Sequence, residues 1–263
     1  MTESPQATAA AQLLVAVRRG APRLAALPAE LVPQTLVEAY AIQHAALRAL
    51  HTDIAGWKAT LLAAKIESNQ GLCAPLGARF VVDAPAFVLP YHQPTANTSE
   101  FGIEPELAFR LGSDLPPLGA KAAYSRASVS AAIISAHATI EVVVSRFLDP
   151  TKVTEFERVA DACSNEVLVV GPSLPSWRQL SLTDLPLRVC IDGIPVYQGP
   201  ASHPLKDPLL PVVWLANHVS GLGRGLRAGE LITTGSCNGL RTLRKGQSAN
   251  AYFTGLGAAQ VQF

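Results

Sequence analysis

Gly102-Ile103-Glu104-Pro105-Glu106-Leu107 is the most informative stretch of this chain. Side chains alternate between the two faces of a β-strand, so Glu104 and Glu106 are predicted to point to the same side. Two neighbouring carboxylates repel each other unless water solvates them, one of them is protonated, or a cation lies between them. For an isolated pair, a solvated strand edge is the usual explanation, because glutamate is mostly exposed.

A third glutamate, Glu141, shifts this interpretation toward a metal site. It lies in Thr139-Ile140-Glu141-Val142-Val143-Val144, the most strand-like run of the sequence. An ionised glutamate is rarely buried without a partner, although a single one can also face water. Three carboxylates on two strands suit a hard octahedral cation such as Mg²⁺, with water or substrate oxygens as the remaining ligands. The pattern therefore leaves a metal site and a solvated face as the two alternatives.

Lys58 is the third element of the predicted site. It lies among apolar neighbours in Ile54-Ala55-Gly56-Trp57-Lys58-Ala59. Such a lysine either extends its ammonium group to the surface or acts as an acid/base or carboxylate-binding group beside a metal. Other chemistries have weaker support: there is no GxSxG motif, the six histidines show no HxxxH or HxH spacing, and no histidine is visibly paired with the thiol of Cys237.

The remaining pattern divides the chain into a helical N-terminal segment, residues 1–55, and a β-rich body, residues 56–263. Helical periodicity or helix-terminating residues mark 7–19, 33–50 and 211–220. Predicted strands are 80–82, 104–111, 131–135, 140–145, 167–170, 187–191, 231–234, 251–253 and 259–263. Asp192-Gly193 is typical of a two-residue turn between strands. The predicted fold class is α+β, because regular βαβ alternation is missing.

Composition excludes several classes of protein. The 263 residues carry 21 Lys plus Arg against 20 Asp plus Glu, which is not the basic balance of a nucleic-acid-binding protein. No apolar run is long enough to span a membrane, and the start Met1-Thr2-Glu3-Ser4 does not resemble a secretory signal. The four cysteines are far apart, as expected of free thiols. We therefore expect a cytoplasmic protein that binds neither nucleic acid nor membrane.

Nine short blocks occur along the chain in a fixed order. They are Ala39-Tyr40-Ala41-Ile42-Gln43-His44, Gly56-Trp57-Lys58, Ile103-Glu104-Pro105-Glu106-Leu107-Ala108, Ile140-Glu141-Val142-Val143 with Ser145-Arg146, Val159-Ala160-Asp161 with Ser164, His203-Pro204-Leu205, Trp214-Leu215-Ala216-Asn217, Leu231-Ile232-Thr233-Thr234-Gly235 and Gly255-Leu256-Gly257. In this joint order the blocks resemble one family over nearly the full length: the 2-keto-4-pentenoate hydratases and 4-oxalocrotonate decarboxylases of the fumarylacetoacetate hydrolase superfamily.

The resemblance implies a mixed β-roll of the fumarylacetoacetate hydrolase type, preceded by the helical segment and assembled as a homo-oligomer. It also implies a role for each candidate residue. Glu104, Glu106 and Glu141 would hold Mg²⁺ or Mn²⁺, Lys58 and Asp83 would be the catalytic lysine and its acidic partner, and Ser164 and Asp161 would bind the substrate.

The activity that the resemblance implies is that of a metal-dependent lyase acting on a short 2-keto or 2-hydroxydienoate acid. Hydration of 2-hydroxypenta-2,4-dienoate to 4-hydroxy-2-oxopentanoate, within the meta-cleavage of aromatic compounds, is the leading expectation. Alternatives are a 4-oxalocrotonate-type decarboxylase, an acylpyruvate C–C hydrolase and a non-catalytic 2-keto-acid-binding homologue. The last is motivated by two departures from the family, Ala162 where it has Asn and Ala59-Thr60 where it has a Gly-Leu-Thr block.

Overall fold

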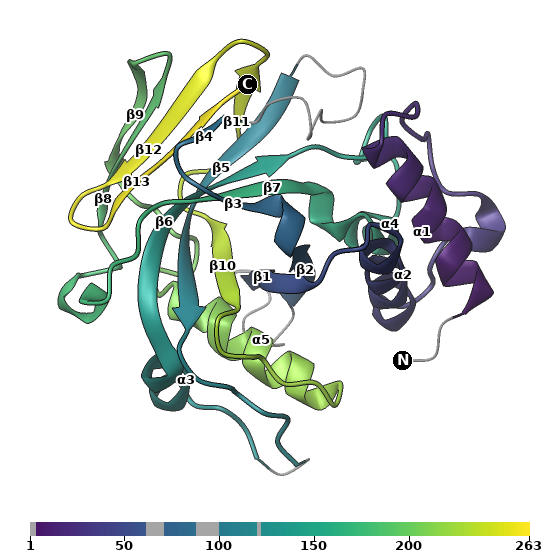
Figure 1. Cartoon of the computed structure of the whole chain (residues 1–263), viewed down its shortest axis with the longest axis horizontal. Helices are drawn as coiled ribbons and strands as arrows, with labels where there is room; N and C mark the ends of the chain where they lie inside the picture. Colours follow the sequence, from purple (N-terminus) through teal and green to yellow (C-terminus); the bar gives the residue numbers. More distant parts are fainter. Residues whose placement is uncertain (1–3, 62–70, 88–99, 120–121) are drawn as a thin grey trace.

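The structure is a computed structural model that describes residues 4–61, 71–87, 100–119 and 122–263. The N-terminal helices lie at one side of a strand-rich body, on the right of Figure 1. The α-helices are α1 (Pro5–Arg18), α2 (Leu36–Ala49), α3 (Arg126–Ala132), α4 (Glu155–Ala160) and α5 (Leu209–Gly221). Short 3₁₀ turns are η1 (Ala29–Leu31), η3 (Ala78–Phe80), η5 (Ala162–Ser164) and η6 (Trp177–Gln179).

Capping residues fix the points at which the two N-terminal helices begin. The Ser4 hydroxyl accepts the N–H of Ala7, so α1 begins at Pro5, a residue that suits the first turn of a helix. The Thr35 hydroxyl accepts the N–H of Glu38, and α2 therefore begins at Leu36 rather than at the predicted residue 33. These two helices pack on each other, and α2 also packs on α4.

The larger sheet curls back on itself. Its strand order is β2-β1-β10-β5-β6-β7-β3, and β11 pairs with β5. Because β2 and β3 lie at its two edges yet are joined only by η3, the sheet closes into a roll. Its strands are β1 (Ile54–Leu61), β2 (Gly71–Gly77), β3 (Val81–Asp83), β5 (Glu100–Leu111), β6 (Ile133–Val143), β7 (Asn165–Val170), β10 (Leu231–Ser236) and β11 (Arg241–Arg244).

A smaller sheet completes the body, at the upper left of Figure 1. Its order is β4-β13-β12-β8-β9, and the predicted Asp192-Gly193 turn joins β8 to β9, with both residues at positive φ. Its strands are β4 (Ala86–Phe87), β8 (Pro186–Ile191), β9 (Ile194–Pro200), β12 (Ser248–Phe253) and β13 (Gly257–Gln262). The mixed α+β class predicted from the sequence is confirmed.

One predicted division is wrong. Residues 131–135 and 140–145 were expected to form two strands, but β6 runs unbroken from Ile133 to Val143. Ser125 caps a short helix, α3, which ends at Ala132 directly before the strand. The long strand pairs with β5 along almost its whole length, and this pairing outweighs the local interruption at Ala136-His137.

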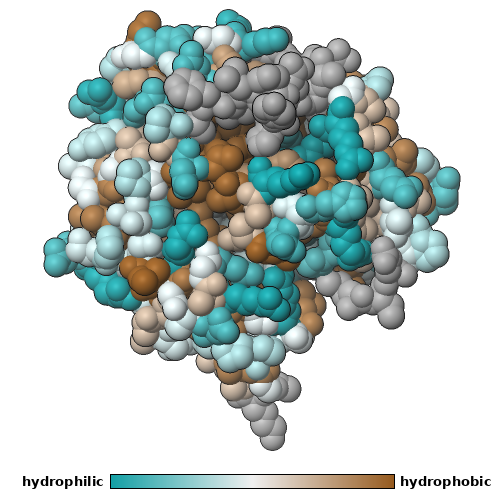
Figure 2. Space-filling view, viewed as in Figure 1, coloured by the Kyte–Doolittle hydropathy of each residue, from teal (hydrophilic) through white to brown (hydrophobic). Residues whose placement is uncertain are grey.

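Apolar residues fill both sides of the curled sheet. The main core lies between the sheet, the helices and the smaller sheet, whereas a second cluster of Leu76, Ala108, Leu168, Val170 and Leu231 lies apart from it. The face shown in Figure 2 is largely polar, and apolar residues are gathered in a hollow near its centre. Among the described residues, no helix has both the length and the apolar character needed to cross a membrane.

Candidate metal centre and active site

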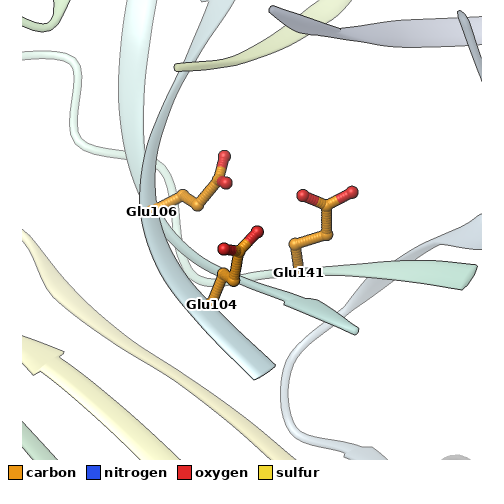
Figure 3. Close-up of side chains that lie close together, drawn as sticks. All are labelled: Glu104, Glu106 and Glu141. Atoms are coloured by element: carbon orange, nitrogen blue, oxygen red, sulfur yellow. The ribbon is translucent and has the colours of Figure 1, made fainter. Parts of the chain in front are cut away.

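The three glutamates singled out in the sequence meet on the curled sheet. Glu104 and Glu106 project from β5, and Glu104 lies opposite Glu141 in the antiparallel pairing with β6. One carboxylate oxygen from each lies within 4.8 Å of the others. Figure 3 shows the three side chains extending to the same side, toward a common space. Strand alternation thus places Glu104 and Glu106 on one face, and strand register brings Glu141, 37 positions after Glu104, beside them.

Glu106 is fully buried, and only one of its two carboxylate oxygens accepts a hydrogen bond from the described residues. Its Oε2 accepts the backbone N–H of Gly235 at 3.1 Å, whereas Oε1 has no hydrogen-bond partner among the described residues. Gly235 has a φ of +95°, a conformation that a residue with a Cβ rarely adopts. A buried carboxylate oxygen without a donor is costly unless a cation lies beside it, so this atom fits a metal ligand.

Glu141 is also fully buried and is held from two sides. The Nδ2 of Asn165 donates to its Oε1 at 2.8 Å. The Nζ of Lys58 lies 2.8 Å from its Oε2, which makes a close ion pair. The carboxylate is therefore fixed in orientation before any ligand arrives.

Lys58 is a buried ammonium rather than a surface lysine. Its side chain is 9% exposed, and besides Glu141 it contacts the carbonyl oxygen of Cys163, to which Nζ donates at 3.1 Å. Burial alone would lower the pKa of Lys58, but the charges of Glu141, Cys163 and the other glutamates raise it by more, so the net pKa lies above its ordinary value. The lysine is thus protonated at neutral pH.

The electrostatics of the carboxylates favour a divalent cation. Burial raises the pKa of both Glu104 and Glu106, and repulsion from Glu141 raises these pKa values further. Ionised, the three carboxylates and the Lys58 ammonium carry a net charge of −2. Hard oxygen ligands with this charge fit a single Mg²⁺ or Mn²⁺ ion.

A cavity of about 560 Å³ opens beside these groups. Lys58, Glu104 and Glu106 line its charged part, and Leu61, Leu72 and Leu205 contribute apolar walls. His203 also lines it, with both ring nitrogens engaged: one contacts the carbonyl of Thr234 at 2.8 Å and the other accepts the N–H of Leu205 at 3.3 Å. These contacts link His203 to β10 and to its own loop.

The structure does not bring Asp83 to Lys58. Asp83 is exposed on β3, the edge strand of the roll, and it is not among the described residues that line the cavity. The pairing of β3 with β7 fixes this position, because Asp83 lies opposite Val170.

Asp161 and Ser164, the predicted substrate-binding residues, flank Cys163 but are not among the described residues that line the cavity. Asp161 is buried against Arg146, whose Nε and backbone N–H both donate to its carboxylate. The backbone carbonyl of Ser164 accepts the N–H of Val144, and Ser164 is not among the described cavity-lining residues. Both residues therefore shape the chain beside the site, and Cys163 between them reaches the cavity.

Sequence reasoning missed three contributors: Asn165, Gly235 and the carbonyl of Cys163. Two of them act through the backbone, which leaves no mark on residue type. Gly235, which directly follows the predicted strand 231–234, was the one available signal, since a glycine in a strand often marks a close backbone approach.

A rolled mixed sheet with three convergent carboxylates beside a buried lysine defines a class of α+β proteins with an acidic cluster at the wall of a cavity, and comparisons with known proteins give the family. Residues 74–263 match the profile "Fumarylacetoacetate (FAA) hydrolase C-terminal". The chain belongs to the fumarylacetoacetate hydrolase family, as the order of its sequence blocks indicated.

Individual relatives agree with this assignment. A 2-keto-4-pentenoate hydratase of Paraburkholderia xenovorans is 30% identical over 100% of this chain and 96% of its own length. 2-Keto-4-pentenoate hydratase 3 of Pseudomonas putida matches with the same identity and coverage. Among solved structures, a 4-oxalocrotonate decarboxylase from Pseudomonas putida G7, complexed with calcium and acetate, has a TM-score of 0.79 at 23% identity and covers 98% of this chain and 97% of its own.

Proposed function

We propose that this protein is a divalent-metal-dependent hydro-lyase that adds water to 2-hydroxypenta-2,4-dienoate and forms 4-hydroxy-2-oxopentanoate. One observation carries the proposal: Glu104, Glu106 and Glu141 converge within 4.8 Å beside the buried Lys58, at the wall of a cavity. The full-length relatives named as 2-keto-4-pentenoate hydratases support the choice of reaction.

The three glutamates would hold Mg²⁺ or Mn²⁺. The unpartnered Oε1 of Glu106 and the net charge of the cluster support this donor set. A bound divalent cation supplies a Lewis acid, which makes the C2 carbonyl of a 2-keto acid a better electron sink. The protein's own contribution is to fix the ligands, since Gly235 holds one carboxylate and Asn165 another.

Lys58 is the group we assign to proton transfer. Its ammonium group lines the cavity and is held by Glu141 and by the carbonyl of Cys163, so a proton is available at Nζ beside the substrate space. General acid catalysis by a positioned group of this kind contributes about 10²- to 10⁴-fold in rate. Asp83, which is exposed on β3, has no part in this proposal.

The apolar walls Leu61, Leu72 and Leu205 would receive the hydrocarbon part of a short 2-keto acid. We further propose that the protein works in the cytoplasm as a homo-oligomer, as the family resemblance implies. Light scattering of the purified protein tests the assembly.

Turnover assays test the reaction. 2-Hydroxypenta-2,4-dienoate, 4-oxalocrotonate and an acylpyruvate would each be supplied with MgCl₂ and, in parallel, with EDTA. The proposal requires hydration of the first substrate that is lost with EDTA. Release of CO₂ from the second substrate alone would identify a decarboxylase instead, and cleavage of the third alone would identify a C–C hydrolase. Metal binding without turnover of any of them would identify a binding protein.

A further inference from the structure

Asn165 is buried at the start of β7 and contacts Glu141, one of the three glutamates of the proposed metal site. Its Nδ2 donates to Oε1 of Glu141 at 2.8 Å, the carboxylate oxygen that faces away from Lys58. Asn165 itself is 4% exposed and lies opposite Val143, so strand pairing fixes its backbone. An amide N–H facing a carboxylate oxygen is a charge-assisted hydrogen bond and is stronger than one between neutral groups.

The backbone of Asn165 is anchored by two arginines. Its carbonyl oxygen accepts from Nη1 and Nη2 of Arg146 and from Nη1 of Arg18, each at 3.0 Å. Arg146 is 2% exposed and is paired with the carboxylates of Asp161 and Glu166. The guanidinium groups therefore fix the residue whose side chain holds Glu141.

The turn that precedes Asn165, residues 162–164, contacts Lys58. Ala162, Cys163 and Ser164 have φ values of 50°, 51° and 63°, and three consecutive non-glycine residues in this left-handed region are unusual. Such strain persists where the surroundings enforce it, and it clusters at functional sites. Here the turn aims the carbonyl of Cys163 at the ammonium of Lys58.

We propose that Asn165 is a positioning residue for the metal ligand Glu141, and that the Arg146-anchored segment 161–165 is the element that sets the orientation of both Glu141 and Lys58. The proposal rests on the proposed metal site and adds the residue that orients one of its ligands. Without the amide of Asn165, the one polar contact that the Glu141 carboxylate keeps among the described residues is with Lys58, which draws the carboxylate toward the lysine.

The expected effect is on metal affinity. Partners that orient a metal ligand contribute about 10- to 100-fold to metal affinity or activity. Asn165→Leu keeps the approximate size of the side chain and removes the N–H donor, so it should raise the Kd for Mn²⁺ by about that factor. If Asn165 had a purely structural role, Asn165→Leu would lower the free energy of unfolding but leave the Kd of the folded protein for Mn²⁺ unchanged.

The experiment is a calorimetric titration of full-length protein, freed of metal with EDTA and dialysed, with MnCl₂. Asn217→Leu is the matched control, because the amide of Asn217 bonds to the backbone of Tyr124 and Val213, outside the described cavity lining. The proposal requires a raised Kd for Asn165→Leu and a wild-type Kd for Asn217→Leu. An equal Kd in all three folded proteins, or an equal increase in both variants, would overturn it.

Two further measurements complete the test. If Asn165→Leu does not fold, Asn165→Ser replaces it, because the serine side chain is too short to reach Glu141 at the same distance. A Kd of Asn165→Ser for Mn²⁺ within twofold of wild type would overturn the proposal. If wild-type protein binds no Mn²⁺ at all, the proposed metal-dependent function fails instead, so the two failures are distinguishable.

Discussion

Replacing Glu106 by glutamine separates the stability of the fold from metal binding more sharply than any other single change. Glu106 is fully buried, its Oε2 accepts the N–H of Gly235, and its Oε1 has no partner among the described residues. Glu106→Gln keeps the shape and the acceptor for Gly235 while removing one negative charge. The charge of the cluster, including Lys58, falls from −2 to −1.

The magnitudes follow from the spacing of the carboxylates. Two unit charges 4.8 Å apart interact by about 3–4 kcal/mol at an effective dielectric constant of about 20. Glutamine ends this repulsion with Glu104 and Glu141 and also ends an attraction to Lys58, so the metal-free variant should be more stable by about 1–3 kcal/mol. In the variant a bound divalent cation has one anionic ligand fewer. If its binding free energy falls by about 3 kcal/mol, the size of one such charge interaction, the Kd rises by about 10²-fold.

Urea unfolding in EDTA measures the first effect, and titration with MnCl₂ measures the second. We expect the variant to unfold at higher urea than wild type and to bind Mn²⁺ about 10²-fold more weakly, with turnover abolished. A Kd within threefold of wild type would refute the assignment of Glu106 as a ligand. A metal-free variant less stable than wild type would show that the charge of Glu106 supports the fold.

Two further predictions concern other groups. Lys58→Met should reduce turnover at least about 10²-fold. The Kd for Mn²⁺ should not rise, because removing the ammonium group frees the Glu141 carboxylate from its ion pair. Unchanged turnover would exclude Lys58 from proton transfer. Burial, followed by the charges of Arg224 and Arg48, lowers the pKa of His44 to about 4. An unfolded His44 binds its proton near pH 6.5, so the free energy of unfolding should fall by about 1–3 kcal/mol as the pH drops from 6.5 toward 4. His44→Leu should remove that part of the pH dependence in urea titrations, and an identical slope in both proteins would contradict this origin.

Local patterns in the sequence were sufficient for several features. The alternation along Glu104, Pro105 and Glu106 predicts a shared face without knowledge of the partner strand, because a strand repeats every two residues. The segments 7–19 and 211–220 were likewise expected as helices, and α1 and α5 form there. Such features depend on neighbours within a few residues, which the sequence displays directly.

Features that depend on distant pairing were not accessible in the same way. Asp83 was a reasonable acidic partner for Lys58 by its position in the chain, but β3 pairs with β7 at the edge of the roll and leaves Asp83 exposed. Residues 133–135 and 140–143, which were expected in two separate strands, belong to one strand because β5 pairs along almost the whole of β6.

The sequence by itself determined the charges of the site: three glutamates, two of them on one face of a strand, and a lysine in an apolar run. Only the tertiary structure decided which hydrogen-bonding groups hold them. The amide of Asn165, the N–H of Gly235 and the carbonyl of Cys163 reach the glutamates and the lysine from turns and strands remote in the chain. Backbone groups are identical in every residue except proline, so their direction is set by φ, ψ and strand pairing and cannot be inferred from the side chain that accompanies them.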